Sequence, residues 1–230
     1  MPRTLPKNRT TPRGLKRHQN IPPPPPPPPP PPSPPLPLIL HSLGDSETHG
    51  FGNTRSYRPF LINALIARNW DVTTVGTLSG STWGEPELNH DGHDGWSSGH
   101  FWQNWALPAD IAIIWLGAND IVTLDYSAAQ FATNMTGIRN RHEAVCNKVV
   151  LVTQFPGSNW TLAQQTRLAE YKDVADTLVT SKTTACHRLY NSFNPATMLR
   201  ANDTIHLNDS VGNPWAANEI LQHLIDNCGV

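Results

Sequence analysis

The sequence lacks the features that would assign it to a membrane or to nucleic acid. It contains no run of 18 apolar residues, so no transmembrane helix is expected. Its net charge is −1, which favours neither nucleic acid nor a charged membrane surface as a partner. It has only three cysteines, which allow one disulfide and leave one thiol over. We therefore expect a partner that is neither nucleic acid nor membrane.

Proline is distributed very unevenly. Most of the 23 prolines lie in residues 1–37, including the unbroken run 22–32. Proline has no amide donor and a fixed φ, so such a run forms an extended, solvated polyproline II segment. Residues 1–20 are rich in Lys and Arg and poor in apolar side chains, which predicts disorder. We predict a tail over residues 1–37 and one folded domain over residues 38–230, an ordinary size for a single core.

The signals for localisation disagree with one another. Sequons for N-glycosylation favour secretion. They occur at Asn8, Asn134, Asn159, Asn202 and Asn208. The N-terminal segment, however, has no apolar stretch of the kind that a signal peptide needs. We predict a secreted, monomeric domain whose chain start is atypical.

Apolar runs alternate with helical patterns throughout the folded part. We expect strands over residues 38–43, 71–75, 110–116, 148–153 and 187–190. We expect helices over residues 57–69, 127–145, 161–181 and 213–227, a long loop over 76–99 and a short helix over 101–106. This alternation predicts an α/β protein with a five-stranded parallel sheet between two helical layers. Ligands of such sheets bind beyond the carboxyl ends of the strands.

Two cysteines precede neighbouring predicted strands. Cys146 precedes the fourth strand and Cys186 the fifth. If these strands are adjacent and parallel, both thiols lie at the same sheet edge. We predict a Cys146–Cys186 disulfide, with two free buried thiols as the alternative that the pattern equally allows.

Two short patches carry side chains suited to a nucleophile and its base in ester hydrolysis. Ser46 follows the first strand in Gly44-Asp45-Ser46, where the hydroxyl is expected at a sharp turn. Asp203 and His206 are three residues apart, so the carboxylate can orient an imidazole that acts as a base. Each patch also has a structural interpretation, because Ser46 can cap a helix and an Asp-x-x-His sequence is common in loops.

Asn119 lies in Gly117-Ala118-Asn119-Asp120, after the third strand. A side-chain amide at that place can donate to a developing oxyanion. Asn and Asp are also ordinary turn residues, which is the structural alternative.

Together with the Gly-rich segment 89–99, these patches resemble the four sequence blocks of the SGNH (GDSL) hydrolases. Residues 89–96 in particular look like those of carbohydrate esterase family 3, the acetylxylan esterases. The resemblance spans about residues 38–227. It implies a flavodoxin-like α/β/α fold, hydrolysis of acetyl esters on xylan, and no cofactor or metal.

The same resemblance assigns roles to individual residues. Ser46 would be the nucleophile, His206 the base and Asp203 its partner. The Ser46 and Gly95 amides and the Asn119 side chain would form the oxyanion hole, with Gly92 as an alternative to Gly95. Asp45 and Trp96 are assigned to substrate binding, because Asp45 lies beside the nucleophile and an aromatic face can stack on a sugar.

The chain departs from the family pattern directly after the nucleophile. The family usually has an aliphatic residue there, whereas this chain has Glu47. A carboxylate that faces the site would repel an oxyanion, and one that faces away would be harmless. The direction of this side chain cannot be decided from the sequence.

Two other patterns offer competing sites. Gly95-Trp96-Ser97-Ser98-Gly99 fits the Gly-x-Ser-x-Gly motif, but no buried strand precedes it, so Ser97 is the weaker nucleophile. His90, Asp91, His93, Asp94 and His100 are metal-ligand types. Gly-rich spacing gives them no common face, and we favour roles in a substrate loop. Trp102 is a second sugar contact candidate, whereas Trp115 is expected in the core.

The sequence therefore predicts a serine esterase that removes acetyl groups from a plant polysaccharide. Two alternatives stay open. One is an esterase or lipase for other short acyl esters in the same fold. The other is a non-catalytic carbohydrate-binding protein.

Overall fold

The fold is described from a computed structural model, which describes residues 33–51, 55–79, 88–101 and 106–230. Contacts divide the chain into Met1–Ser33 and Pro34–Val230. Residues 1–32 of the predicted tail, together with Trp83, Trp102 and Trp105, lie outside the described residues. The last two residues of that tail, Leu36 and Pro37, belong to the first strand.

The described part of Pro34–Val230 contains one parallel sheet. Its strands are β1 (Leu36–Gly44), β2 (Trp70–Val75), β3 (Asp91–Gly92), β4 (Ala109–Trp115), β5 (Cys146–Val152) and β6 (Thr183–Cys186). Their order is β2-β1-β4-β5-β6, and the short β3 pairs with the end of β1. The predicted α/β class with a parallel sheet is confirmed, and β3 is an addition to it.

Helices connect these strands. They are α1 (Ser46–His49), α2 (Tyr57–Ile66), α3 (Ser98–Phe101), α4 (Ala118–Val122), α5 (Ala128–Val145), α6 (Leu162–Thr177), α7 (Arg188–Ser192), α8 (Pro195–Met198) and α9 (Gly212–Cys228). Three of the longer ones begin at side-chain caps: the hydroxyls of Ser56, Ser127 and Thr161 accept amide hydrogen bonds from the first turns of α2, α5 and α6. Within the described residues, no helix has the length and apolarity needed to cross a membrane.

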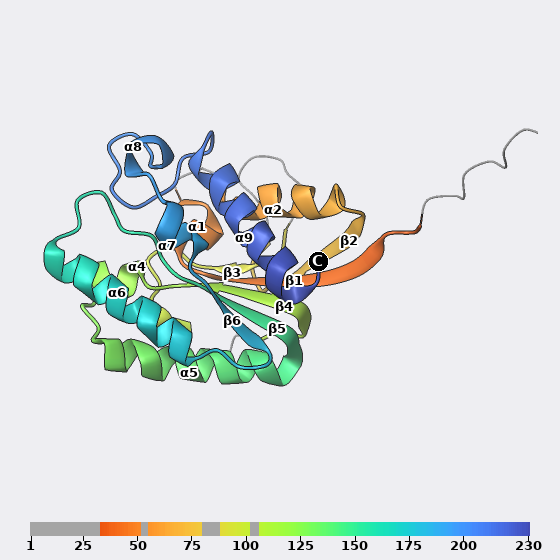
Figure 1. Cartoon of the computed structure of the whole chain (residues 1–230), viewed down its shortest axis with the longest axis horizontal. Helices are drawn as coiled ribbons and strands as arrows, with labels where there is room; N and C mark the ends of the chain where they lie inside the picture. Colours follow the sequence, from red (N-terminus) through yellow and green to blue (C-terminus); the bar gives the residue numbers. More distant parts are fainter. Residues whose placement is uncertain (1–32, 52–54, 80–87, 102–105) are drawn as a thin grey trace, which may run out of the picture. The chain divides into compact units, whose positions relative to one another are not determined.

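Two apolar layers enclose the sheet (Figure 1). Helices α2 and α9 cover one face, and α5 and α6 cover the other. Strand β4 is buried on both faces: Ile111 and Ile113 belong to the first core cluster, whereas Ala112 and Ile114 belong to the second. This explains why the strand is a continuous apolar run in the sequence.

The strand register aligns the ends of the strands at one edge. Gly44 pairs with Trp115, Trp115 with Val152, and Val152 with Cys186. Gly92 at the end of β3 also pairs with Gly44. The segments that follow β1, β3 and β4 therefore begin side by side, and these segments contain Ser46, Gly95 and Asn119.

The predicted fifth strand was misplaced. Residues 187–190 mostly form α7, and the strand lies just before them, in Thr183–Cys186. Among the described strands, this edge strand pairs only with β5, and it lacks the continuous apolar run of the central strands.

The disulfide interpretation is wrong for the same reason. Cys146 begins β5, whereas Cys186 ends β6 and pairs with Val152. The two cysteines are thus at opposite ends of neighbouring strands, about 20 Å apart at the rise of a strand residue. Cα atoms must lie within about 7 Å for a disulfide, and all three cysteines are free.

Candidate active site

Ser46 lies at the turn that leaves β1, as the first residue of α1. The turn requires glycine at position 44, because a Cβ there would lie 2.5 Å from the Trp115 carbonyl oxygen. The far end of α1 is held by Arg58, whose guanidinium donates to the carbonyls of Thr48 and His49 at 2.7 and 3.3 Å. The Ser46 side chain is thus fixed between the sheet edge and α2.

Ser46, His206 and Asp203 form a continuous hydrogen-bonded series. Ser46 Oγ lies 2.9 Å from His206 Nε2, and His206 Nδ1 lies 2.8 Å from Asp203 Oδ2. The other Asp203 oxygen accepts the amides of Ile205 and His206. Partial burial raises the pKa of Asp203, but these amide bonds and the imidazole outweigh it and lower the pKa below its usual range. An ionised Asp203 keeps a proton on Nδ1 and leaves Nε2 free to accept one from Ser46.

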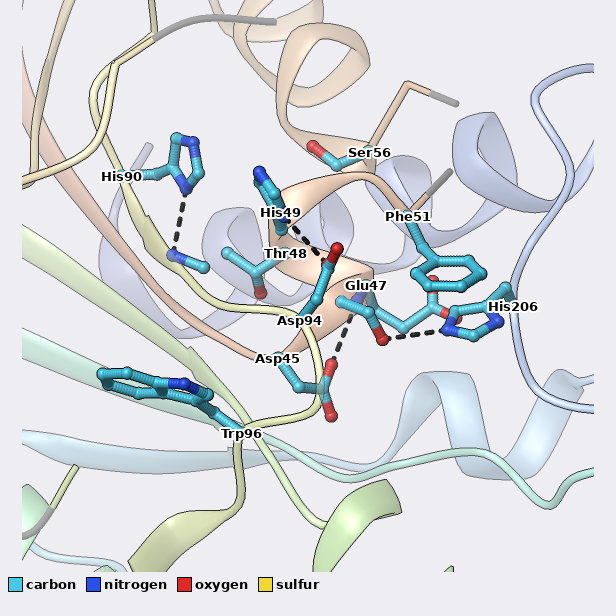
Figure 2. A network of polar contacts seen from close by, with 12 residues as sticks. Asp45, Glu47, Thr48, His49, Phe51, Ser56, His90, Asp94, Trp96 and His206 are labelled. Atoms are coloured by element: carbon cyan, nitrogen blue, oxygen red, sulfur yellow. Dashed lines mark hydrogen bonds and ion pairs between the residues drawn. The ribbon is translucent and has the colours of Figure 1, made fainter. Parts of the chain in front are cut away.

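Phe51 covers one face of His206 and was missed in the sequence. Its ring is stacked on the imidazole with centroids 4.1 Å apart and an interplanar angle of 9° (Figure 2). The Arg200 guanidinium carbon lies over the Phe51 ring, 5.7 Å from its centroid. The guanidinium also donates to the Phe51 carbonyl at 3.3 Å. The stack therefore restricts the orientation of the His206 ring.

A tight turn over residues 93–96 follows β3 and is hydrogen-bonded to the end of β1 and to the segment after β4. The His93 amide donates to the Gly44 carbonyl at 3.0 Å, and the Trp96 amide donates to the His93 carbonyl at 3.2 Å. Gly95 has φ +75°, as the third position of a type II turn requires. Asn119 Nδ2 donates to the Trp96 carbonyl at 3.0 Å. The turn therefore brings the predicted oxyanion donors to the same edge as Ser46.

Gly92 and Gly95 differ in what their amides do. The Gly92 amide donates to His90 Nδ1 at 3.0 Å. Burial, with the nearby Arg58 charge, lowers the pKa of His90 to about 3, so this imidazole is a neutral acceptor. A Cβ at Gly92 would also lie 2.5 Å from the His49 nitrogen, so glycine there is explained by packing. The exposed Gly95 is therefore the better candidate for an oxyanion donor.

Asn119 is held in place by its neighbour in α4. Asp120 is fully buried, and both of its oxygens accept the Ser98 amide at 3.0–3.1 Å. The Ser98 hydroxyl donates to Asp120 as well and in turn accepts from Asn134. These bonds fix α4 against α3. Asn119 donates one amide hydrogen to the Trp96 carbonyl, and its amide has a second hydrogen that can serve an oxyanion.

Asp45 was predicted to bind substrate, and the structure contradicts a direct contact. Its side chain is 0% exposed. Asp45 Oδ1 accepts the Glu47 amide at 3.0 Å and so caps α1. Burial raises the pKa of Asp45 to about 7, and the charges of Asp120 and Asp94 add to this effect. Its role is to shape the turn that presents Ser46.

This raised pKa predicts a stability change with pH. The folded protein binds the Asp45 proton more tightly than the unfolded chain does, so stability falls as pH rises from about 4 to about 7. Asp45→Asn keeps the cap acceptor without the charge. We expect it to be more stable than the wild type at pH 8, by up to about 4 kcal/mol, and similar at pH 4. Urea denaturation at both pH values measures the free energy of unfolding, and Asp71→Asn, at an exposed position, is the control. An equal stability difference between Asp45→Asn and the wild type at pH 4 and pH 8 would contradict this prediction.

Glu47 is buried and bonded to the segment that contains His206. Glu47 is 4% exposed, and its Oε1 accepts the Leu207 amide at 3.2 Å. Burial, followed by the charge of Asp45, raises the pKa of Glu47 well above its usual range. The departure from the family pattern is thus accommodated by a buried hydrogen bond.

The tryptophans in the described residues have different environments. Trp115 is fully buried and its indole donates to Gln154 at 2.7 Å, which confirms the expected core position. Trp96 is half-buried, with His93 stacked on its ring at 3.9 Å. Phe101 packs against Trp96 edge-on. Much of the Trp96 ring is therefore used in packing, and its contact with a sugar stays a prediction.

The alternative nucleophile, Ser97, is inaccessible. Its side chain is 0% exposed, and its hydroxyl lies 3.0 Å from His100 Nδ1. The residues before it form the turn over 93–96 rather than a strand. Neither the approach of a substrate nor the geometry of the Gly-x-Ser-x-Gly motif is available there.

The His and Asp residues of the Gly-rich segment diverge. Asp91 pairs with the buried His41 at 2.7 Å, and Asp94 pairs with His49 at 2.8 Å. His90 accepts the Gly92 amide, His93 stacks on Trp96, and His100 contacts Ser97. Within the described residues, no group of three His, Cys, Asp or Glu side chains is placed to hold a metal ion. These residues instead fasten β3 and the following turn to β1 and α1.

A Ser–His–Asp series at the carboxyl edge of a parallel α/β sheet is an arrangement found in serine hydrolases. The sequence model of the GDSL-like lipase/acylhydrolase family matches residues 42–211. The chain therefore belongs to this family and is a carboxylic ester hydrolase. No curated protein sequence matches it.

Solved structures support the same fold. A family 3 carbohydrate esterase from Clostridium thermocellum is 22% identical, with a TM-score of 0.70 over 83% of this chain and 96% of that one. A family 3 carbohydrate esterase from Talaromyces cellulolyticus is also 22% identical, with a TM-score of 0.69 over 82% and 97%. An acetylxylan esterase from Geobacillus stearothermophilus is 16% identical, with a TM-score of 0.58 over 81% and 94%.

Proposed function

We propose that this chain removes acetyl groups from an acetylated polysaccharide, with acetylated xylan as its substrate. The observation that carries the chemistry is the series from Ser46 Oγ through His206 to Asp203, at 2.9 and 2.8 Å. The choice of substrate is supported by the likeness to two family 3 carbohydrate esterases and to an acetylxylan esterase. Phe51 is 39% exposed beside His206, so the accessible part of its ring can contact a sugar.

The reaction proceeds through an acetyl-enzyme. Ser46 Oγ attacks the acetyl carbonyl carbon while its proton moves to His206 Nε2. The resulting oxyanion accepts hydrogen bonds from the Ser46 and Gly95 amides and from Asn119 Nδ2. The bond to the sugar oxygen then breaks, and the His206 proton is transferred to that oxygen. Asp203 stabilises the imidazolium throughout.

Water completes the cycle. His206 takes a proton from a water molecule, whose oxygen attacks the acetyl-Ser46 carbonyl. The same donors hold the second oxyanion. Acetate leaves as the proton returns to Ser46 Oγ. Every proton is carried by His206, and this scheme calls on no cofactor.

Comparison of substrates tests the proposal. Acetate release from acetylated xylan is measured beside hydrolysis of p-nitrophenyl acetate, butyrate and octanoate. We expect acetate from xylan, and a fall in kcat/KM of at least about tenfold from the acetate to the octanoate ester. A loss of about 1.4 kcal/mol of transition-state stabilisation by the poorly fitting longer chain lowers the rate tenfold. Preference for octanoate with no acetate from xylan would instead identify an esterase or lipase for longer acyl chains.

A further inference from the structure

Glu47 forms a contact that links two distant parts of the site. It follows Ser46 directly on α1, and its Oε1 accepts the amide of Leu207, which follows His206 directly. The two residues are 160 positions apart in the sequence. One hydrogen bond of 3.2 Å therefore joins the residue after the nucleophile to the residue after the base.

The same contact completes the fixation of the His206 backbone. The His206 amide donates to Asp203 Oδ1 and its carbonyl accepts the Arg200 amide, both at 3.0 Å. The following amide, that of Leu207, donates to Glu47. Leu207 is 1% exposed, so water cannot easily replace a lost acceptor. A buried amide left unsatisfied would favour a shift of this segment.

We propose that Glu47 is a positioning residue, which holds the His206 segment at hydrogen-bonding distance from Ser46 by accepting the Leu207 amide. This inference rests on the proposed roles of Ser46 and His206. It gives the unusual residue beside the nucleophile a function in the reaction that is separate from substrate contact.

The surroundings of Glu47 indicate that its function depends on accepting a hydrogen bond and not on carrying a negative charge. Asp45 and Asp203 lie near enough to oppose its ionisation, and Arg200 favours it. Burial, followed by the charge of Asp45, raises the pKa of Glu47, which favours the neutral acid. Gln has the same shape and the same acceptor as this neutral acid. Met has a similar length but offers no comparable acceptor.

The test compares Glu47→Gln with Glu47→Met in the full chain, using p-nitrophenyl acetate. We expect Glu47→Gln to keep kcat within about threefold, and Glu47→Met to lose about 10- to 100-fold in kcat with little change in KM, as for a misplaced catalytic group. Glu143→Met is the matched control. Glu143 Oε1 accepts from Thr183 at 2.5 Å near the start of β6, so its loss affects stability without touching the site.

A second measurement reads the site without substrate. The proton between His206 Nδ1 and Asp203 is followed by NMR. We expect the wild-type signal in Glu47→Gln and a shifted or lost signal in folded Glu47→Met. An unchanged signal with unchanged kcat in Glu47→Met would overturn the inference, as would equal losses in both variants. If the wild type hydrolyses no ester, the proposed function fails, and the NMR comparison still decides the role of Glu47.

Discussion

Ser46→Ala is expected to lower kcat for ester hydrolysis by at least about 10⁴-fold, because it removes the only hydroxyl bonded to His206 in the described residues. Substrate binding should change little, since the variant loses one oxygen at a 7% exposed position. The residual rate would come from the oxyanion donors and from bound water. Initial rates on p-nitrophenyl acetate, with circular dichroism to confirm folding, measure the effect.

Ser97→Ala is the matched control for this prediction. It removes the same atom from the serine of the competing Gly-x-Ser-x-Gly motif. Ser97 is fully buried, so we expect roughly wild-type kcat and only a stability loss from its missing bond to His100. The reverse pattern, with activity retained in Ser46→Ala and lost in Ser97→Ala, would exchange the two assignments.

Asn119→Ala is expected to lower kcat by about 10²- to 10³-fold with little change in KM, because the amide acts on charge that exists only in the transition state. Part of the loss would come from the turn over 93–96, since Asn119 also donates to the Trp96 carbonyl. Steady-state kinetics on acetate esters separates kcat from KM.

Asn147→Ala controls for the general loss of an amide hydrogen bond. Asn147 Nδ2 donates to Asp110 at 2.9 Å, near the start of β4 and β5 and so away from Ser46. We expect its kcat to be unchanged. A rise in KM alone for Asn119→Ala would show that Asn119 binds the substrate and not the oxyanion.

The sequence predicted most of the sheet because the central strands are buried on both faces. In β4, residues 111–114 contribute to both core clusters, which leaves a continuous apolar run that is easily recognised. The edge strand β6 has the sequence Thr-Thr-Ala-Cys and no such run. That is why the strand was placed too late and the disulfide was predicted wrongly.

The site was predictable where a motif fixes its own local geometry. Asp203 and His206 are bonded within four residues, and Gly44 is required by the turn at Ser46. Contacts between distant segments left no comparable signal. The stacking of Phe51 on His206 is an example, because an isolated aromatic in a Gly-rich segment has no periodicity. The burial of Asp45 likewise depends on tertiary packing.

The secretion of this domain, expected from its N-glycosylation sequons, stays a prediction.

Covalent labelling tests the central claim, that Ser46 is the nucleophile, most directly. The full chain is incubated with a p-nitrophenyl phosphonate, which reacts with an activated serine, and the adduct is located by peptide mass spectrometry. We predict one adduct per chain on the peptide that contains Ser46, and none in His206→Ala, where the base is missing. An adduct on Ser97, or full esterase activity after labelling of Ser46, would contradict the account.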